Sequence, residues 1–387
     1  MENNKTPSIR FKGFTDPWEQ RKAKELFVST ADKGYPELPV LSATQNRGMI
    51  RRDENSINIF HDKKNEAGYK RVLPGQFVIH LRSFQGGFAH SAIEGITSPA
   101  YTVFGFSEPE KHDSEYWKYV FTSKSFIRRL ETVTYGIRDG RSISYDEFLT
   151  LGFAYPSKAE QTAIAQYLDK LSDLITLHQR KYNKLLNVKK SMLEKMFPKN
   201  ESNIPEIRFK GFTDPWEQRK LGDVTDFLDT LRKPLKETDR EPGPYPYYGA
   251  SGIVDHVADY IFDEELILLS EDGANITDRN YPVCFLATGK YWVNNHAHVL
   301  KARNKMDNNF ICMSMERKDY SNYNTGMAMP KLNKDTCCQI PVDCPTFEEQ
   351  NKIGEYFLNL DNLITLHQRE WKGKRIWKKS MLEKMFV

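Results

Sequence analysis

The 387-residue sequence lacks the features of a membrane protein or a disulfide-stabilised protein. It has no run of eighteen apolar residues, and its first residues, MENNKTPSIRFKGF, contain no apolar signal stretch. Its five cysteines all lie in the second half, form no CxxC pair and are odd in number, which favours reduced thiols. We therefore expect a cytoplasmic protein without a membrane partner.

The motifs of common enzymatic chemistry are also missing. We find no GxxxxGK[ST] phosphate loop, no GxGxxG after a predicted strand, no GxSxG and no Asn/Asp-Pro-Pro-aromatic motif of adenine methyltransferases. His296 and His298 could bind a metal from one strand face. Without a nearby Cys/Asp cluster, structural or DNA-contacting histidines are favoured. We predict no catalytic residue, no metal site and no cofactor on this chain.

The chain also lacks a large net charge. Its 56 Lys and Arg residues nearly balance its 52 Asp and Glu residues, which leaves a net charge of +4. Residues 201–344 carry 17 basic and 23 acidic side chains, a net charge of −6. A duplex-binding protein is expected to show a basic face. If this chain binds DNA, a local patch must act against the average charge of that segment.

What the sequence does contain is a duplication. The segment IRFKGFTDPWEQRK occupies residues 9–22 and returns unchanged at 207–220. A second set of repeats is offset by 189 residues: LITLHQR at 174–180 and 363–369, and KKSMLEKMF at 189–197 and 378–386. The blocks between them, about 23–155 and 221–344, share no alignment that we can see. The duplicated parts therefore predict a scaffold that holds two unlike blocks.

Each long repeat predicts a helix. Ser157 and Thr346 each stand three residues before a glutamate, which is the spacing of a capping box. Apolar residues then recur at 4-3-4-3 spacing, typical of a coiled-coil seam, which Lys189, Lys374 and Lys378 interrupt. The predicted helix-pair interface consists of Ile164, Leu168, Leu171, Ile175 and His178 in the first copy, and Ile353, Phe357, Leu360, Ile364 and His367 in the second.

The order of these parts predicts the domain organisation. We expect a globular domain at 1–155, a spacer helix at 156–200, a second globular domain at 201–344 and a second spacer helix at 345–387. The fold class is mixed α/β (α+β), with the two domains separated by long antiparallel coiled-coil helices in a pseudo-two-fold arrangement. Each copy of IRFKGFTDPWEQRK then joins the end of a helix to the next block.

Within the blocks, β-rich runs at 75–81, 100–106 and 266–270 predict strands. Residues 114–132 have helical spacing, with Tyr116, Val120, Ile127 and Leu130 on one face. Several polar loops contain the side chains that read bases or bind phosphates. Taken singly, each of these residues is more simply a solvated loop residue. The candidate DNA-binding residues are Arg82, Ser83, Gln85, Arg138, Arg141, Ser142, Asn275, Lys290, Trp292, Asn294, Asn295, His296 and Lys331.

These segments resemble the DNA-specificity subunit of Type I restriction–modification systems over nearly the whole chain. The resemblance rests on both copies of IRFKGFTDPWEQRK, on the two P-S/T-x-x-E-Q…LITLHQR…KKSMLEKMF helices, and on the segments at 69–104 and 270–300. It implies two target-recognition domains, each reading one half of a gapped DNA site. It also implies helices that set the gap and bind two methyltransferase subunits.

The resemblance further implies that catalysis belongs to partner subunits. S-adenosylmethionine would bind the methyltransferase subunits, which methylate adenine, and ATP and Mg²⁺ would bind restriction and translocase subunits of the full complex. Two alternatives remain. An enzyme with an atypical site would need clustered carboxylates or a cofactor loop. A coiled-coil adaptor that binds proteins would show no sequence-specific reading of double-stranded DNA.

Overall fold

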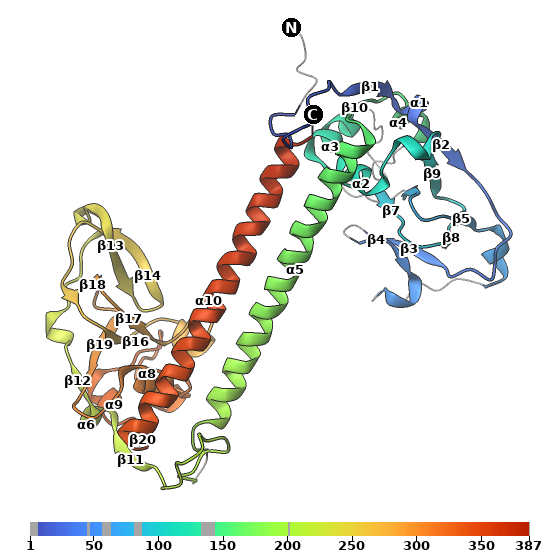
Figure 1. Cartoon of the computed structure of the whole chain (residues 1–387). Helices are drawn as coiled ribbons and strands as arrows, with labels where there is room; N and C mark the ends of the chain where they lie inside the picture. Colours follow the sequence, from blue (N-terminus) through green and yellow to red (C-terminus); the bar gives the residue numbers. More distant parts are fainter. Residues whose placement is uncertain are drawn as a thin grey trace. The chain divides into compact units, whose positions relative to one another are not determined.

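The computed structural model describes residues 7–44, 47–55, 63–80, 87–132, 144–199 and 202–386. Contacts divide the chain into two compact units (Figure 1). Unit 1 comprises Met1–Leu177 with Glu370–Val387, and unit 2 comprises His178–Arg369. Each unit therefore contains one block and the parts of both long helices that adjoin it.

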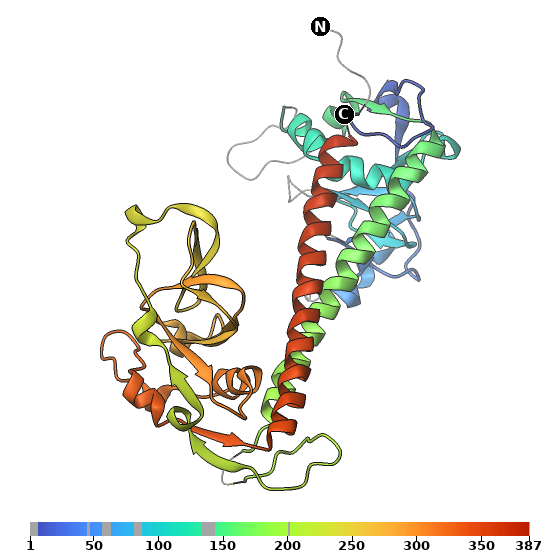
Figure 2. The same cartoon turned by 60° about the vertical axis from the view of Figure 1, so that its left-hand side comes forward.

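The two long repeats form the predicted helices, α5 (Lys158–Lys195) and α10 (Phe347–Lys384), of 38 residues each. At 1.5 Å per residue each is about 57 Å long. In both units the helix segments run side by side (Figures 1 and 2). In unit 1, Ile164 and Leu168 of α5 share a core with Met381 of α10. In unit 2 it is the start of α10 that packs with the end of α5, so the segments are antiparallel.

Two of the three lysines that interrupt the seam bind polar groups of the facing helix, whereas Lys374 donates to Glu370 of its own helix. In unit 2, Lys189 donates to both carboxylate oxygens of Asp361, at 2.6 and 2.8 Å. In unit 1, Lys378 donates to the Ser172 hydroxyl at 2.5 Å. These contacts place charged groups on the seam without leaving their ammonium groups unpaired.

Predicted interface residues become progressively less buried toward the middle of each helix. Buried members are Ile164, Leu168 and Leu171 in unit 1 and Ile353, Phe357 and Leu360 in unit 2. Ile175 and Ile364 are half-buried. The two histidines of the repeat, His178 and His367, meet with their Nδ1 atoms 3.0 Å apart.

The blocks, although unlike in sequence, contain an antiparallel sheet of the same strand order. In unit 1 the order is β2 (Phe27–Thr30), β9 (Thr102–Phe106), β6 (Phe77–Ile79) and β7 (Phe88–His90). In unit 2 it is β12 (Thr225–Phe227), β19 (Ala297–Ala302), β16 (Leu266–Ser270) and β17 (Cys284–Ala287). The predicted strands at 100–106 and 266–270 are confirmed, as is the described part of the one at 75–81.

The blocks differ in their additional strands. Unit 1 adds the pairs β3 (Leu41–Thr44) with β4 (Gly48–Arg51) and β5 (Lys70–Val72) with β8 (Gly95–Thr97). Unit 2 adds a second sheet of β14 (Gly252–Val257), β13 (Pro242–Gly249), β18 (Lys290–Val293) and β15 (Phe262–Asp263). Variation between the blocks is therefore concentrated outside the shared sheet.

Short helices complete the described part of each block. Unit 1 contains α1 (Ala23–Leu26), α2 (Ser114–Thr122), α3 (Lys124–Thr132), α4 (Tyr145–Leu149) and the 3-10 turns Arg52–Glu54, Lys63–Gly68 and Pro109–Lys111. Unit 2 contains α6 (Leu221–Val224), α7 (Asn275–Asp278), α8 (Asn308–Glu316), α9 (Lys334–Cys338) and the turns Asp229–Leu231, Glu237–Asp239 and Ser321–Tyr323.

The single helix predicted over 114–132 is wrong, because Ser123 separates α2 from α3. The Ser123 hydroxyl donates to the Val120 carbonyl at 2.7 Å and accepts from the Phe126 N–H, which ends one helix and starts the next. The break re-aims the second helix, so that Phe126 is fully buried while Ile127 is only half-buried.

Candidate nucleic-acid interface

Each copy of the short repeat is fixed to the helices of its own unit. The EQRK strand β1 (Glu19–Lys22) pairs with β10 (Gly152–Tyr155), and β11 (Glu217–Lys220) pairs with β20 (Pro341–Cys344). The Ile9 N–H donates to the Lys384 carbonyl at the end of α10, and the Ile207 N–H donates to the Lys195 carbonyl at the end of α5. Each copy thus joins a helix end to the strand that precedes the other helix.

A buried ion pair strengthens each junction. Arg10 donates to both carboxylate oxygens of Glu160, and Arg208 does the same to Glu349, all at 2.7 Å. The glutamates are 1% and 0% exposed. Each carboxylate therefore binds an arginine of the short repeat instead of closing the predicted capping box. Bidentate geometry of this kind holds both groups in one orientation.

The adjoining glutamines connect the scaffold to the blocks. Gln161 Oε1 accepts from the Asp113 N–H at 3.0 Å, and Gln350 Oε1 accepts from the Asp307 N–H at 3.2 Å. Asp113 and Asp307 are themselves the N-caps of α2 and α8. Two blocks of unlike sequence are therefore held in the same way, at the start of an equivalent helix. We call each set of Arg–Glu and Gln–Asp contacts a bracket.

Unit 2 brings three segments together at one face, Glu271–Gly273, Asn294–His296 and Asn324–Lys331, which we name the three-loop face. The backbone N–H of Glu271 donates to the His296 carbonyl at 2.9 Å. The Gly273 N–H donates to the Pro330 carbonyl at 3.0 Å. Residues that are distant in sequence are thus joined through their backbones.

The charges of the three-loop face are largely paired. His296 Nδ1 lies 2.9 Å from an Asp272 carboxylate oxygen, and Lys331 Nζ lies 3.5 Å from Glu271. Arg232 donates to Glu271 and to a backbone carbonyl of β19, both at 2.7 Å. Because the two carboxylates, Glu271 and Asp272, are balanced by the cations Lys331 and Arg232, the face offers hydrogen-bonding groups with little net charge.

A buried pair beneath the face supports it. His298 is 1% exposed; its Nδ1 lies 2.7 Å from Asp229, and its Nε2 lies 2.7 Å from the Leu332 carbonyl. Burial would raise the pKa of Asp229, but the hydrogen bond and charge of His298, the Val299 N–H and Arg232 together lower it. Of the two readings left open for the histidines, this geometry makes His298 structural, whereas His296 is exposed.

The seven candidate DNA-binding residues of unit 2 do not all lie on the three-loop face. Asn295, His296 and Lys331 are exposed on the three-loop face, whereas Asn294 is buried there and its Oδ1 accepts from the His296 N–H at 2.8 Å. The other three have partners of their own: the Asn275 side chain bonds to Tyr281, Lys290 lies over the Tyr260 ring, and the Trp292 indole donates to the Lys233 carbonyl.

Asp272 and Glu271 were not predicted as organising residues, because carboxylates repel DNA phosphates and the candidates were therefore taken from cationic and neutral polar side chains. The signal was present in the sequence SEDGAN, which follows a predicted strand. The remaining candidates, Arg82, Ser83, Gln85, Arg138, Arg141 and Ser142, lie outside the described residues.

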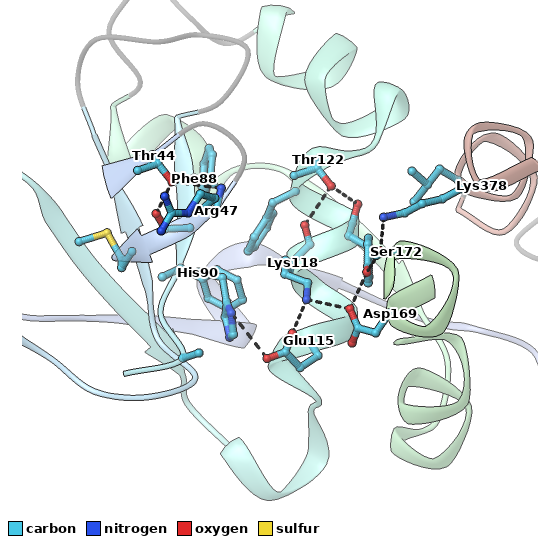
Figure 3. Close-up of a pocket in the computed structure, with 17 residues that line it drawn as sticks. Thr44, Arg47, Phe88, His90, Glu115, Lys118, Thr122, Asp169, Ser172 and Lys378 are labelled. Carbon is cyan, nitrogen blue, oxygen red and sulfur yellow. Dashed lines mark hydrogen bonds and ion pairs between the residues drawn. The ribbon is translucent and has the colours of Figure 1, made fainter. Parts of the chain in front are cut away.

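In unit 1, the described residues form a cavity of about 500 Å³ between the β3–β4 hairpin, α2 and both long helices (Figure 3). Lys118 of α2 points toward Glu115 and toward Asp169 of α5, whose carboxylate lies 3.0 Å from its Nζ. The Tyr119 hydroxyl donates to the same carboxylate at 2.6 Å. Burial lowers the pKa of Lys378, which reaches in from α10. These contacts tie α2 to the helix pair.

The described residues were also searched for metal-binding groups and for disulfides. They contain no group of three or more His, Cys, Asp or Glu side chains placed to bind a metal ion. All five cysteines are free thiols, and burial raises the pKa of Cys284, Cys337 and Cys344. In the part of the chain that the structure describes, no helix is long and apolar enough to cross a membrane.

Comparison with known proteins agrees with this architecture. A family model for the Type I restriction modification DNA specificity domain matches residues 213–372, which contain the three-loop face and, of the second bracket, Asp307, Glu349 and Gln350. Over these 160 residues, the chain is thus similar to the DNA specificity domain of Type I restriction–modification systems. A protein of Haemophilus influenzae assigned as a type I restriction enzyme specificity subunit is 33% identical over 155 residues, 40% of this chain and 39% of that protein.

Two further proteins extend the comparison. The MjaVIII specificity subunit of Methanocaldococcus jannaschii is 26% identical over 201 residues, 48% of this chain and 45% of that protein. The chain thus matches less than half the length of these two relatives. A crystal structure of the S subunit of a Type I restriction–modification system from M. genitalium has the same fold, with a TM-score of 0.66, 16% identity and 99% of both chains covered.

Proposed function

We propose that this chain is the non-catalytic DNA-recognition subunit of a Type I restriction–modification complex. Each block reads one half of a gapped double-stranded DNA site, and the complex works where the genome lies, in the cytoplasm. The proposed domains are 1–155 and 201–344, with spacer helices at 156–200 and 345–387. The partners that would perform the chemistry are two methyltransferase subunits and the restriction and translocase subunits.

The observation that carries this proposal is the pair of brackets. Two blocks that cannot be aligned are attached by the same Arg–Glu and Gln–Asp contacts, and both contain the same sheet order. A protein whose two blocks recognise different DNA sequences needs blocks that differ in sequence but are attached to the helices in the same way. An adaptor for a single protein partner would not require unlike blocks on equal supports.

The long helices supply the spacing in this proposal. Half-sites read from one side of a duplex lie about 34–36 Å apart, or a multiple of that distance. Each helix has 38 residues without an internal proline, so its length of about 57 Å is enough to separate two recognition blocks. Deleting whole turns from both helices should therefore shorten the unspecified gap and leave the two half-sites unchanged.

The LITLHQR copies offer equal surfaces for two equal partners. In unit 1, Leu174 and Leu177 are 40% and 45% exposed; in unit 2, Leu363 and Leu366 are 45% and 50% exposed. These leucines lie off the seam, and both copies expose the same two positions. We propose that each copy binds one methyltransferase subunit, which brings S-adenosylmethionine, whereas ATP and Mg²⁺ belong to the restriction subunits.

The proposed function is tested by sequencing adenine methylation in cells that express this chain with its methyltransferase subunit. The expected result is a split, gapped motif. Replacing residues 23–155 with the corresponding block of another family member should change one half, and replacing 221–344 should change the other. A stable complex that methylates no defined site would contradict DNA recognition and would favour the adaptor.

Docking is tested separately by introducing charge on the exposed leucines. Leu174→Glu or Leu363→Glu should reduce the number of bound methyltransferase subunits from two to one, as measured by light scattering of the purified complex. Leu186→Glu is the control, because Leu186 is 39% exposed on α5 outside the repeated heptapeptide. Equal assembly by all three variants would refute the proposed docking surface.

A further inference from the structure

One loop of the three-loop face holds an apolar side chain entirely in solvent. Met327 is 105% exposed and Met329 is 61% exposed, whereas Leu332, just after this loop, is fully buried. A single exposed apolar residue is ordinary on a protein surface. The unusual feature is that the surrounding backbone is held in one shape by several specific contacts.

The loop is closed by its own side chains. Asn324 Oδ1 accepts from the backbone N–H groups of Gly326 and Lys331, both at 2.9 Å. The Thr325 N–H donates to the Lys331 carbonyl at 2.8 Å. A Cβ atom at position 326 would lie 1.8 Å from the Met329 carbonyl oxygen, so only glycine fits there. Met327 is therefore presented by a preorganised loop, which lowers the entropic cost of a contact.

The base of this loop is joined to the hydrogen-bonding part of the face. The Leu332 N–H donates to the Glu271 carbonyl at 2.7 Å, next to the Gly273–Pro330 bond. Since the carboxylates of Glu271 and Asp272 are paired with Arg232, Lys331 and His296, the face carries little free positive charge for phosphates. Neutral donors and acceptors beside an apolar side chain suit base edges better than a charged backbone.

The edge of a base pair in the major groove contains one apolar group, the 5-methyl group of thymine. We propose that Met327 contacts a thymine methyl group in the half-site read by the second block and so helps to select that base pair. This inference rests on the proposed function. Removing one buried methyl group weakens binding by about fourfold, equivalent to about 0.8 kcal/mol.

The experiment uses the assembled complex with its methyltransferase and a duplex containing the site found by methylation sequencing. Each thymine of the half-site that changes when residues 221–344 are exchanged is replaced in turn by deoxyuridine, which lacks only the methyl group. Fluorescence anisotropy then measures the dissociation constants. For the unaltered complex, we expect one position at which deoxyuridine weakens binding about fourfold.

Met327→Ala should weaken binding to the thymine duplex to a similar extent and should lose the sensitivity to deoxyuridine at that position. Met329→Ala, in the same loop, is the matched control and should retain this sensitivity, as should Met327→Leu. Circular dichroism checks that the variants fold. We expect the Met327 variants to fold normally, because this side chain is fully exposed.

Two negative results have different meanings. If the complex binds no specific duplex, the proposed function fails. If it binds its site but no thymine is sensitive, or if Met327→Ala keeps the full deoxyuridine effect, DNA recognition stands and the role of Met327 is refuted.

Discussion

The bracket of unit 2 makes the sharpest prediction about stability. Arg208→Met removes both hydrogen bonds to Glu349 and leaves a fully buried carboxylate without its cation. The arginine is itself only 12% exposed, so solvent screens the pair weakly. Removing one member of a buried, hydrogen-bonded pair costs about 3–5 kcal/mol, most of it the penalty of the remaining charge.

The assay is urea denaturation of the purified chain, with hydrogen exchange to locate the effect. Exchange should increase at residues 207–216 in Arg208→Met, whereas Arg10→Met should increase it at residues 9–18, around the equivalent junction. Lys210→Met is the control, because this exposed side chain should change the free energy of unfolding by less than about 0.5 kcal/mol.

A double substitution tests the physical reason for the loss. Arg208→Met with Glu349→Met removes both charges, so the buried carboxylate no longer needs a partner, and the double variant should be more stable than Arg208→Met alone. Additive losses would show that burial of the unpaired charge is not the cause. A loss below about 1 kcal/mol in the single variant would refute the reasoning, because this is the range of exposed ion pairs.

Further predictions concern the seam, acid stability and the recognition loop. Lys189→Met should lower the free energy of unfolding by up to about 1 kcal/mol, and less in high salt, because Asp361 is 39% exposed. Since the pKa of Asp229 is lowered in the folded chain, its contribution to stability is complete above about pH 4 and is lost as the pH falls through the lowered pKa. The difference in urea stability between the unaltered chain and Asp229→Asn should therefore shrink in that acid range; a constant difference would contradict the shift. Gly326→Ala should alter hydrogen exchange of its loop, whereas Gly373→Ala, on an open helix surface, should stabilise the chain by about 0.5–1 kcal/mol in thermal denaturation.

Much of the scaffold could be predicted from the sequence because its signals are local. Apolar residues at 4-3-4-3 spacing predicted α5 and α10, and β-rich runs predicted strands such as β16. The duplication also indicated that each short repeat joins a helix end to a block, which the Ile9–Lys384 and Ile207–Lys195 hydrogen bonds confirm. These features depend on residues that are close together in the sequence or on exact repetition of a segment, and both can be recognised in the sequence.

Other features depend on residues that meet only after folding. The spacing before Glu160 predicted a capping box. In the structure this carboxylate binds Arg10, which lies 150 residues away in the sequence, and no local pattern indicates that pairing. The common strand order of the sheets in the two blocks could not be predicted from the sequence either. A sheet is set by backbone pairing between distant strands, which tolerates many different side chains.

The sequence by itself therefore determined the duplicated frame, the helices and the absence of the common catalytic motifs. Only the tertiary structure decided which polar residues share a surface. The carboxylates Glu271 and Asp272 and the cations Lys331 and Arg232 come from separate segments, and their charges cancel because backbone hydrogen bonds bring those segments together. Local patterns cannot encode that cancellation, because the energy of a charge depends on its neighbours in space rather than along the chain.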